Sequence, residues 1–532
     1  MRSILDLNSY DMSLFARKKA NKALLLIITS FASIGYAQTN DTIKITTNQL
    51  YEKDINTIFN LPVSYANQDI KDFTHTEVYY NFKKNQFARK QTANEVSRYG
   101  FNAKGLYTTN NEVKLFGSIN LEKYKEKGLA YTLDDLRSDD LEVLDPHYYF
   151  VPRASDWNNQ QYHILAGAVK SFGNFDFALK ASLDANKLAR QTDPRPEISN
   201  RKLGGEAQIG YTFKNHQIFA LGGYYVKDKD YSYYYSNTQL DNIALPETYI
   251  RFQSGFGRIT NKPYNTSSIF TRTKYKKVGL GYQFMNDKTS ILVNYTYNRN
   301  LENWYNKAFM DINFKKFQYL TKIHEGQIRL RQILDDKVLR SSISGYQSTS
   351  KNYDVTLSGT NYINRLRNIT FNINLLKEHS NLVDYYFGAY VSYNQNRYME
   401  KIGYFDQKVN SLMVGIYGNK DFELINSSKF NIGLAANYYT ALKNTLDYMN
   451  VSGNTTNIFY ENVTLYDFQY NGMDKLDVKA DIRYILPVKN NKNVVVYTQL
   501  RSIFALNNYN GNLSVFNTDP TYQVNFGIQL NY

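Results

Sequence analysis

The sequence ends in Tyr522-Gln-Val-Asn-Phe-Gly-Ile-Gln-Leu-Asn-Tyr532, eleven residues in strict alternation. Successive side chains of a β-strand point to opposite faces, with a period of two residues. One face of this segment is therefore apolar or aromatic throughout, whereas the other carries only Gln, Asn and Gly. Such a strand fits either a half-buried strand of a soluble sheet or a strand whose apolar face meets lipid, so the rest of the chain has to separate these two interpretations.

The same alternation recurs from about residue 74 to the end of the chain. Clear examples are residues 99–107, 113–122, 175–186 and 476–486. The period is two rather than the helical 3.6, which predicts strands. The predicted strands run for about 11 to 14 residues, longer than the usual 5–6 of soluble proteins and long enough to cross a bilayer at a tilt.

Short and long connections alternate between these strands. Short links lie at 172–174, 214–216, 286–288, 335–337, 426–428 and 489–492, and long polar segments at 125–158, 187–201, 230–266, 350–364, 442–473 and 507–519. A β-sandwich has no reason to keep up this asymmetry for over 400 residues, whereas a membrane barrel with tight turns at one end and long loops at the other produces it. Nine hairpins predict a single-domain, all-β, transmembrane antiparallel barrel of 18 strands, with 16 as the alternative. The alternation is least clear at 303–320.

The composition agrees with a barrel. A mean hydropathy of −0.53 and the lack of a second long apolar run exclude a helical membrane protein. Aromatic residues make up 15% of the chain, with 49 Tyr against 9 Pro, and Tyr suits both strands and the interfacial girdles of a barrel. The 63 basic and 48 acidic residues are spread along the chain without a basic run. We therefore expect outer-membrane lipid and lipopolysaccharide as partners, and no nucleic acid.

The N-terminus predicts export. Basic residues at 17–22 precede an apolar stretch at 23–34, and Gly35-Tyr-Ala37 supplies small residues for cleavage, so residues 1–37 are interpreted as a signal peptide, with Met12 as a plausible start. Without them the charged residues fall to 58 basic and 46 acidic, a net charge of +12. The chain contains no cysteine, which excludes a lipid anchor through Cys, a disulfide framework and a thiolate metal site. We expect residues 38–73 to form a short periplasmic segment and residues 74–532 the barrel.

Three short motifs add a family resemblance. Asp145-Pro-His-Tyr-Tyr-Phe150, Asp193-Pro-Arg-Pro196 and Gly204-Gly-Glu-Ala-Gln-Ile-Gly-Tyr211 resemble an uncharacterised family of outer-membrane barrels of the Bacteroidota type. The resemblance implies location in the cell outer membrane, a terminal aromatic strand that is read by the assembly machinery, and a TonB-dependent receptor as a partner. It implies no catalytic residues. The chain lacks room for the plug domain of such a receptor before its first strand, and Thr42-Ile-Lys-Ile45 resembles a TonB-contacting box only loosely.

Few residues suggest chemistry. Acidic residues between Asp134 and Asp145 could hold a divalent cation, but their spacing does not match an EF-hand, and a solvated loop is the simpler interpretation. Asp193-Pro-Arg-Pro196 could present Arg195 to an anion or to the lumen, or could be a rigid surface loop. The six histidines are scattered, and no Gly-x-Ser-x-Gly elbow is present. We therefore predict no enzyme, no cofactor and no metal.

The polar faces of the predicted strands supply candidate lumen residues. The charges selected are Lys104, Lys180, Asp477, Lys479, Asp481 and Arg483. Opposite charges across a barrel either set ion selectivity or hold a closed interior together. The leading functional hypothesis is a passive or partner-gated, porin-like transport protein or an accessory of a TonB-dependent uptake system. The alternatives are a non-conducting scaffold or surface-binding barrel and, third, an outer-membrane enzyme.

The long loops are predicted to lie outside the cell. Tyr231 and Tyr233–Tyr235 form a tyrosine cluster in one of them. Tyr binds sugars or proteins at low entropic cost, because it has few rotatable bonds. The alternative is that these rings pack against neighbouring loops and close the mouth of the barrel.

Overall fold

The computed structural model describes residues 57–68, 70, 72–135, 146–234, 249–254, 259–261, 268–306, 315–379, 382–424, 428–449, 459–488, 492–507 and 519–531. These residues belong to one compact unit. Among them, no helix is both long enough and apolar enough to cross a bilayer.

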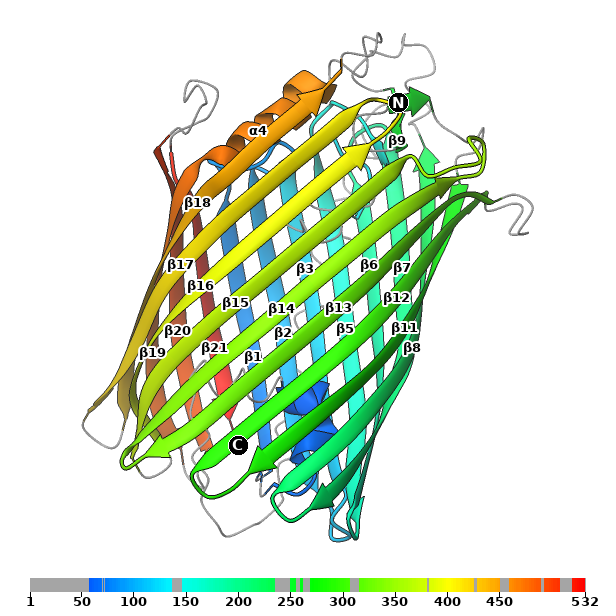
Figure 1. Cartoon of the computed structure of the whole chain (residues 1–532). Helices are drawn as coiled ribbons and strands as arrows, with labels where there is room; N and C mark the ends of the chain where they lie inside the picture. Colours follow the sequence, from blue (N-terminus) through cyan, green and yellow to red (C-terminus); the bar gives the residue numbers. More distant parts are fainter. Residues whose placement is uncertain are drawn as a thin grey trace, which may run out of the picture. The chain divides into compact units, whose positions relative to one another are not determined.

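Eighteen antiparallel strands form one closed sheet (Figure 1). Each strand pairs with its neighbour in the chain, and β21 pairs with β1 from His75–Asn531 to Lys84–Tyr522, which closes the barrel. This confirms the predicted fold class and the count of 18. The strands are β1 Phe73–Lys84, β2 Glu95–Thr108, β3 Lys114–Leu129, β5 Ser155–Phe172, β6 Phe175–Arg190, β7 Arg195–Phe213, β8 His216–Tyr234, β11 Ser268–Met285, β12 Thr289–Asn306, β13 Lys315–Leu334, β14 Lys337–Asp354, β15 Tyr362–His379, β16 Leu382–Glu400, β17 Phe405–Glu423, β18 Lys429–Tyr448, β19 Asp474–Val488, β20 Lys492–Asn507 and β21 Thr521–Asn531.

The strands are longer than predicted, and one predicted loop is mostly strand. Barrel strands run from 11 to 20 residues. The segment 187–201 continues β6 to Arg190 and begins β7 at Arg195, so the connection is only four residues long. Its polar and charged residues resembled a loop because strands that rise beyond the bilayer no longer need an apolar outer face.

The outward face of the barrel is apolar over its middle. Leu179 on β6, Leu280 on β11 and Leu434 on β18 expose 66, 67 and 62% of their surface. At the end with the short turns, contacting rings continue around the outside from Phe172 through Phe175, Tyr211, Phe213 and His216 to Phe284. An apolar band with an aromatic girdle at its edge is the surface that a bilayer-spanning barrel requires.

A small sheet and a helical segment come from the connections at the other end, which we call the loop end. A three-stranded sheet consists of β4 His147–Phe150, β9 Arg251–Ser254 and β10 Ile259–Asn261, with β9 in the middle. Between β18 and β19, a helical segment comprises η7 Tyr460–Thr464 and α4 Leu465–Gly472. Figure 1 shows β9 and α4 at the same end of the barrel.

Residues 57–68 lie inside the barrel at the opposite end, the turn end. They form a helical turn at 57–60 followed by the short helix η1 Pro62–Tyr65, drawn in blue in Figure 1. Val63 is fully buried and packs with Leu61 against side chains of β5, β6, β8 and β12. The lumen at the turn end is therefore occupied by the chain's own N-terminal segment.

Candidate functional site

Two strands show the layers inside the barrel. On β6, Asp176, Ala178 and Lys180 are the inward residues nearest the turn end, and they contact residues 57–68. Beyond Ser182, the inward residues Asp184 and Asn186 line a cavity. Leu188, further along, joins an apolar cluster at the loop end. On β8 the same order appears: Gln217, Phe219 and Leu221 face the N-terminal segment, Lys227 lines the cavity, and Tyr231 joins the apolar cluster.

The N-terminal segment is held at one buried carboxylate. The Asp176 side chain is completely buried and accepts hydrogen bonds from Asn67 Nδ2 at 3.0 Å, Ser171 Oγ at 2.6 Å, Thr212 Oγ1 at 2.7 Å and Gln217 Nε2 at 2.7 Å. Gln217 Nε2 also donates to the carbonyl of Val63 at 3.0 Å. A buried carboxylate needs several donors, and this one obtains them from both the barrel wall and the segment.

Two lysines of the wall bind main-chain carbonyls of the same segment. Lys114 Nζ donates to the carbonyl of Ala66 at 2.8 Å, and Lys180 Nζ to that of Asn60 at 3.0 Å. Lys180 also pairs with Glu206, Nζ to Oε1 at 3.1 Å, and is almost fully buried. The segment is thus docked by polar contacts together with two apolar clusters. Leu61, Val63 and Ala66 pack on side chains of β5, β6, β8 and β12, and Ile58 and Phe59 pack with Phe73, Leu106 and Phe116.

The small sheet and the inner wall form an apolar cluster at the loop end, which we call the roof. It contains Ala93, Leu129, Leu133, Tyr149, Val151, Trp157, Leu188, Ile198, Tyr231, Phe252, Ile269, Trp304 and Phe317. These include both tryptophans of the chain, each completely buried. His147 stacks on Phe317 with ring centres 4.5 Å apart, and burial lowers the pKa of His147 to about 3, so it is neutral.

Ion pairs hold Asp134 and Asp135, which lie in the connection between β3 and β4, against β8. Lys229 Nζ lies 2.9 Å from Asp134 Oδ1 and 2.8 Å from Asp135 Oδ1, and Lys227 Nζ lies 3.1 Å from Asp135 Oδ2. Tyr231 donates a hydrogen bond to Asp134. Burial raises the pKa of Asp134 to about 7 against the pull of Lys229. Burial acts in the same direction on Asp135, but Lys227 and Lys229 hold the pKa of that carboxyl well below its usual range.

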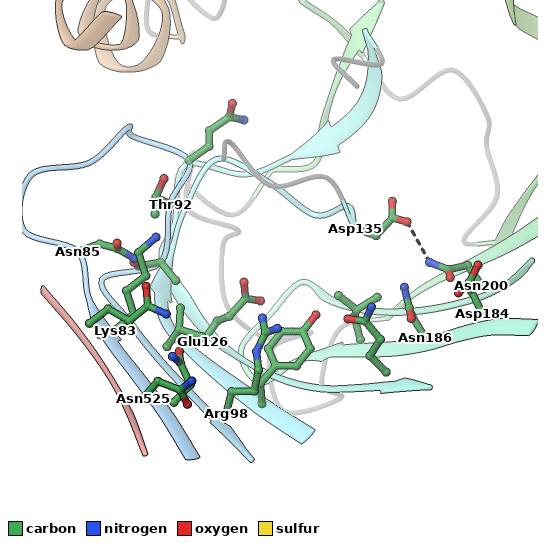
Figure 2. A pocket seen from close by; sticks show the side chains of 18 of the residues that line it. Lys83, Asn85, Thr92, Arg98, Glu126, Asp135, Asp184, Asn186, Asn200 and Asn525 are labelled. Atoms are coloured by element: carbon green, nitrogen blue, oxygen red, sulfur yellow. Dashed lines mark hydrogen bonds between the residues drawn. The ribbon is translucent and has the colours of Figure 1, made fainter. Parts of the chain in front are cut away.

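Between the N-terminal segment and the roof lies a cavity of about 780 Å³, which we call the chamber (Figure 2). Its charged lining residues are Lys83, Arg98, Glu126, Asp135, Asp184, Lys202 and Lys227, and its amide side chains are Asn81, Asn85, Gln91, Gln161, Asn186, Asn200, Gln523 and Asn525. Tyr79, Tyr124 and Tyr275 add rings, and Thr92, Ala93, Val96 and Leu188 complete the lining. In Figure 2, Asp135 and Asn200 face Asn85 and Thr92 across the open space.

The structure does not gather the six predicted lumen charges at one site. Asp477, Lys479, Asp481 and Arg483 form an inward row on β19, because Ile482 between them is exposed on the outer face. Arg483 pairs with Asp481 (Nε to Oδ1, 2.8 Å), and Arg501 on β20 pairs with Asp477 (Nε to Oδ1, 2.8 Å). Lys180 instead holds the N-terminal segment, and Lys104 lies on the inward face of β2, next to the buried Leu106.

The predicted loop motif is a local ion pair. Asp193 is buried, and its Oδ1 lies 2.9 Å from Nε of Arg195, whose side chain is 41% exposed. The predicted TonB-contacting box, most of the acidic loop and Tyr235 lie outside the described residues. Within the described ranges, no group of three His, Asp or Glu side chains is arranged to hold a metal ion.

Sequence reasoning missed the two elements that fill the lumen. Signals for them exist: Ile58-Phe59-Asn60-Leu61-Pro62-Val63 is an apolar run before the first strand, and Tyr148-Tyr149-Phe150 is an aromatic run within a long loop. Both runs have no lipid-facing strand to belong to, so the interior of the barrel is where they can be buried.

Comparison with solved structures finds outer-membrane proteins with low similarity. The siderophore receptor PiuA from Acinetobacter baumannii is 11% identical with a TM-score of 0.41, over 87% of this chain and 82% of that one. The alcaligin outer-membrane receptor FauA from Bordetella pertussis is 9% identical with a TM-score of 0.43, over 87% and 76%. At these scores the likeness carries no inference about ligand or mechanism.

Family comparison is more specific. A search of the curated proteins finds no match to the chain. A family model, however, matches residues 62–532, from η1 to the last strand. This match confirms that the chain belongs to an uncharacterised family. The bacterial group and the TonB-dependent partner that the resemblance implied stay predictions. The chain belongs to the family of unknown function DUF6850.

Proposed function

We propose that this protein is an outer-membrane transport barrel that is closed at rest by its own residues 57–68 and opens when a periplasmic partner displaces them. The observation that carries the proposal is the docking of this segment inside the turn end through Asp176, Lys114 and Lys180. The segment is no part of the closed sheet, so its displacement breaks side-chain contacts with the wall but no hydrogen bond between barrel strands.

The inner wall offers a polar path for a transported solute. Asp477, Arg501, Asp481 and Arg483 pair with one another along β19 and β20, which leaves a charge-balanced polar surface. Polar groups facing a lumen set selectivity for the solute that passes.

The experiment is conductance in planar bilayers after displacing the segment. Asp176→Ala removes the shared acceptor of Asn67, Ser171, Thr212 and Gln217, so openings should become several-fold more frequent than in the unmodified protein. Asp477→Ala is the matched control, since it removes a lumen carboxylate that pairs with Arg501 and belongs to β19, away from the segment. Equal currents from the two variants would contradict gating by residues 57–68.

A non-conducting, surface-binding barrel is the second candidate. The roof favours it, because the small sheet and the ring of His147 bury apolar groups across the loop end. Absence of current from every variant, together with co-purification of a receptor after mild solubilisation, would establish this alternative in place of transport.

A further inference from the structure

The chamber has a composition that differs from an ordinary small-molecule pocket. Sites for drug-like ligands are lined mainly by apolar and aromatic side chains. Here the aliphatic lining comes only from Ala93, Val96 and Leu188, while eight Asn and Gln side chains face the space. Its volume of about 780 Å³ is that of a binding site for a sizeable solute.

Most charged residues of the lining already have a partner within the protein. Arg98 Nη1 pairs with Glu122 at 2.9 Å, Lys227 pairs with Asp135, and Asp184 pairs with His163. The Glu126 carboxylate accepts a hydrogen bond from Asn159 Nδ2 at 2.7 Å. Lys202 lies over the rings of Tyr275 and Tyr225, at 4.9 and 5.3 Å from their centres. The lining thus offers no strong excess of either sign for a highly charged ligand.

The amides, by contrast, keep hydrogen-bonding capacity. The side chains of Asn81, Gln161, Asn186 and Gln523 make no hydrogen bond with any part of the chain that the structure describes. An amide has two N–H donors and a carbonyl acceptor, so Asn81, Gln161 and Gln523 can both donate to and accept from a hydroxyl group, whereas Oδ1 of Asn186 is itself buried. They come from two pairs of neighbouring strands, β21 with β1 and β5 with β6, which are separated by β2 and β3, so they line the space at two places.

We propose that the chamber binds an uncharged, hydroxyl-rich solute of the oligosaccharide class. The many hydroxyls of such a molecule match amides at two places in the wall, and the faces of Tyr79, Tyr124 and Tyr275 supply rigid contact surface. A peptide of mixed sequence fits less well, because its apolar side chains would find only Ala93, Val96 and Leu188. The inference deepens the proposed transport function by naming the solute class, and it rests on that function only for the route of entry.

Binding is tested by calorimetry on the full, detergent-solubilised chain, which needs no open pore. The probes are maltohexaose, cellohexaose and mannohexaose, with hexagalacturonate as the anionic and hexaglycine as the peptide comparison. At least one uncharged hexasaccharide should bind more tightly than either comparison probe. Asn186→Leu and Gln161→Leu should each weaken binding roughly two- to tenfold, the range for one lost hydrogen bond.

The matched control is Asn396→Leu, an amide on β16 that does not line the chamber. It should leave the affinity unchanged, and unaltered circular dichroism would show that all three variants fold. The proposal is overturned if none of the three hexasaccharides binds, if Asn396→Leu weakens binding as much as Asn186→Leu, or if hexagalacturonate or hexaglycine binds most tightly. Calorimetry measures binding only, and the bilayer experiment above measures gating only. Oligosaccharide binding to a protein that shows no gating in bilayers would therefore overturn the proposed gate and leave the assignment of the chamber intact.

Discussion

Single residues in this barrel are understood first by the side of the sheet on which they lie. Leu179 exposes 66% of its surface to the outside, while its neighbour Lys180 is buried against the N-terminal segment. The β19 row and Lys180 lie on the inner side of the barrel, whereas the sequence alternation alone showed only that such residues share one face of a strand. It could not predict the partners of these charges, because register with β20 and the presence of residues 57–68 in the lumen are decided by contacts between distant parts of the chain.

Asp467 on α4 gives a prediction about pH. Its Oδ1 accepts a hydrogen bond from the main-chain N–H of Lys90 at 2.9 Å, and burial raises the pKa of Asp467 to about 6 despite nearby Arg89. A folded-state pKa above the unfolded value of about 4 means that protonation favours the folded loop. The stabilisation is complete below pH about 4 and is lost as the pH rises through 6, by at most about 3 kcal/mol.

Hydrogen exchange of residues 459–472, corrected for the intrinsic rate at each pH, checks this. Protection should fall between pH 5 and pH 7.5 in the unmodified protein. Asp467→Asn cannot ionise, so its protection should be the same at both values. An unchanged pH dependence in the variant would show that another group is responsible.

At the scale of elements, β21 is the strand that the sequence defined best. The predicted strand at 522–532 matches β21 to within one residue at each end, and Phe526 and Ile528 on its predicted apolar face expose 46 and 50% of their surface. Residues 57–68, β4 and β9 were not anticipated, since short apolar runs outside long alternating segments have no periodicity that reveals where they will be buried.

Arginine substitution on β21 tests its contact with lipid. Phe526 lies at the middle of the strand, whereas Tyr522 lies at its loop end and has the same outward direction. Phe526→Arg should lower the free energy of unfolding by about 2–4 kcal/mol, and Tyr522→Arg by about 0–1, because the cost of a charge falls from the bilayer midplane to its surface. Denaturant titrations of the protein folded into phospholipid vesicles measure both. Equal losses would mean that depth in a bilayer does not govern β21.

For the whole molecule, the alternation of short and long connections was sufficient to predict a closed barrel of 18 strands. It did not reveal that residues 57–68 and the small sheet lie inside the two ends of the lumen, because hydropathy patterns describe the wall and not what the wall encloses. The small sheet, the N-terminal segment and the chamber between them are therefore products of tertiary packing alone.

The orientation of the barrel in the membrane remains a prediction, and a pair of epitope insertions tests it. One tag follows Ser358 in the exposed turn between β14 and β15, at the loop end, and the other follows Asn110 in the exposed turn between β2 and β3. Antibody should label intact cells that carry the Ser358 tag, and should label cells with the Asn110 tag only after permeabilisation. The reverse pattern would place the loop end in the periplasm.

The central claim, that residues 57–68 close the lumen at rest, is tested most directly by locking them in place. A Cβ atom on Gly210 would lie 3.0 Å from Cγ2 of Val63, which is close enough for a disulfide between Val63→Cys and Gly210→Cys, and the chain has no other cysteine. Conductance is measured in planar bilayers for a variant that carries both cysteines together with Asp176→Ala. The control variant carries Val63→Cys and Asp176→Ala but keeps Gly210. The account predicts that oxidation abolishes the openings of the paired variant and that reductant restores them. The opening frequency of the control should be the same with oxidant and with reductant. Openings of equal frequency in the oxidised and reduced forms, or no current from either form, would contradict it.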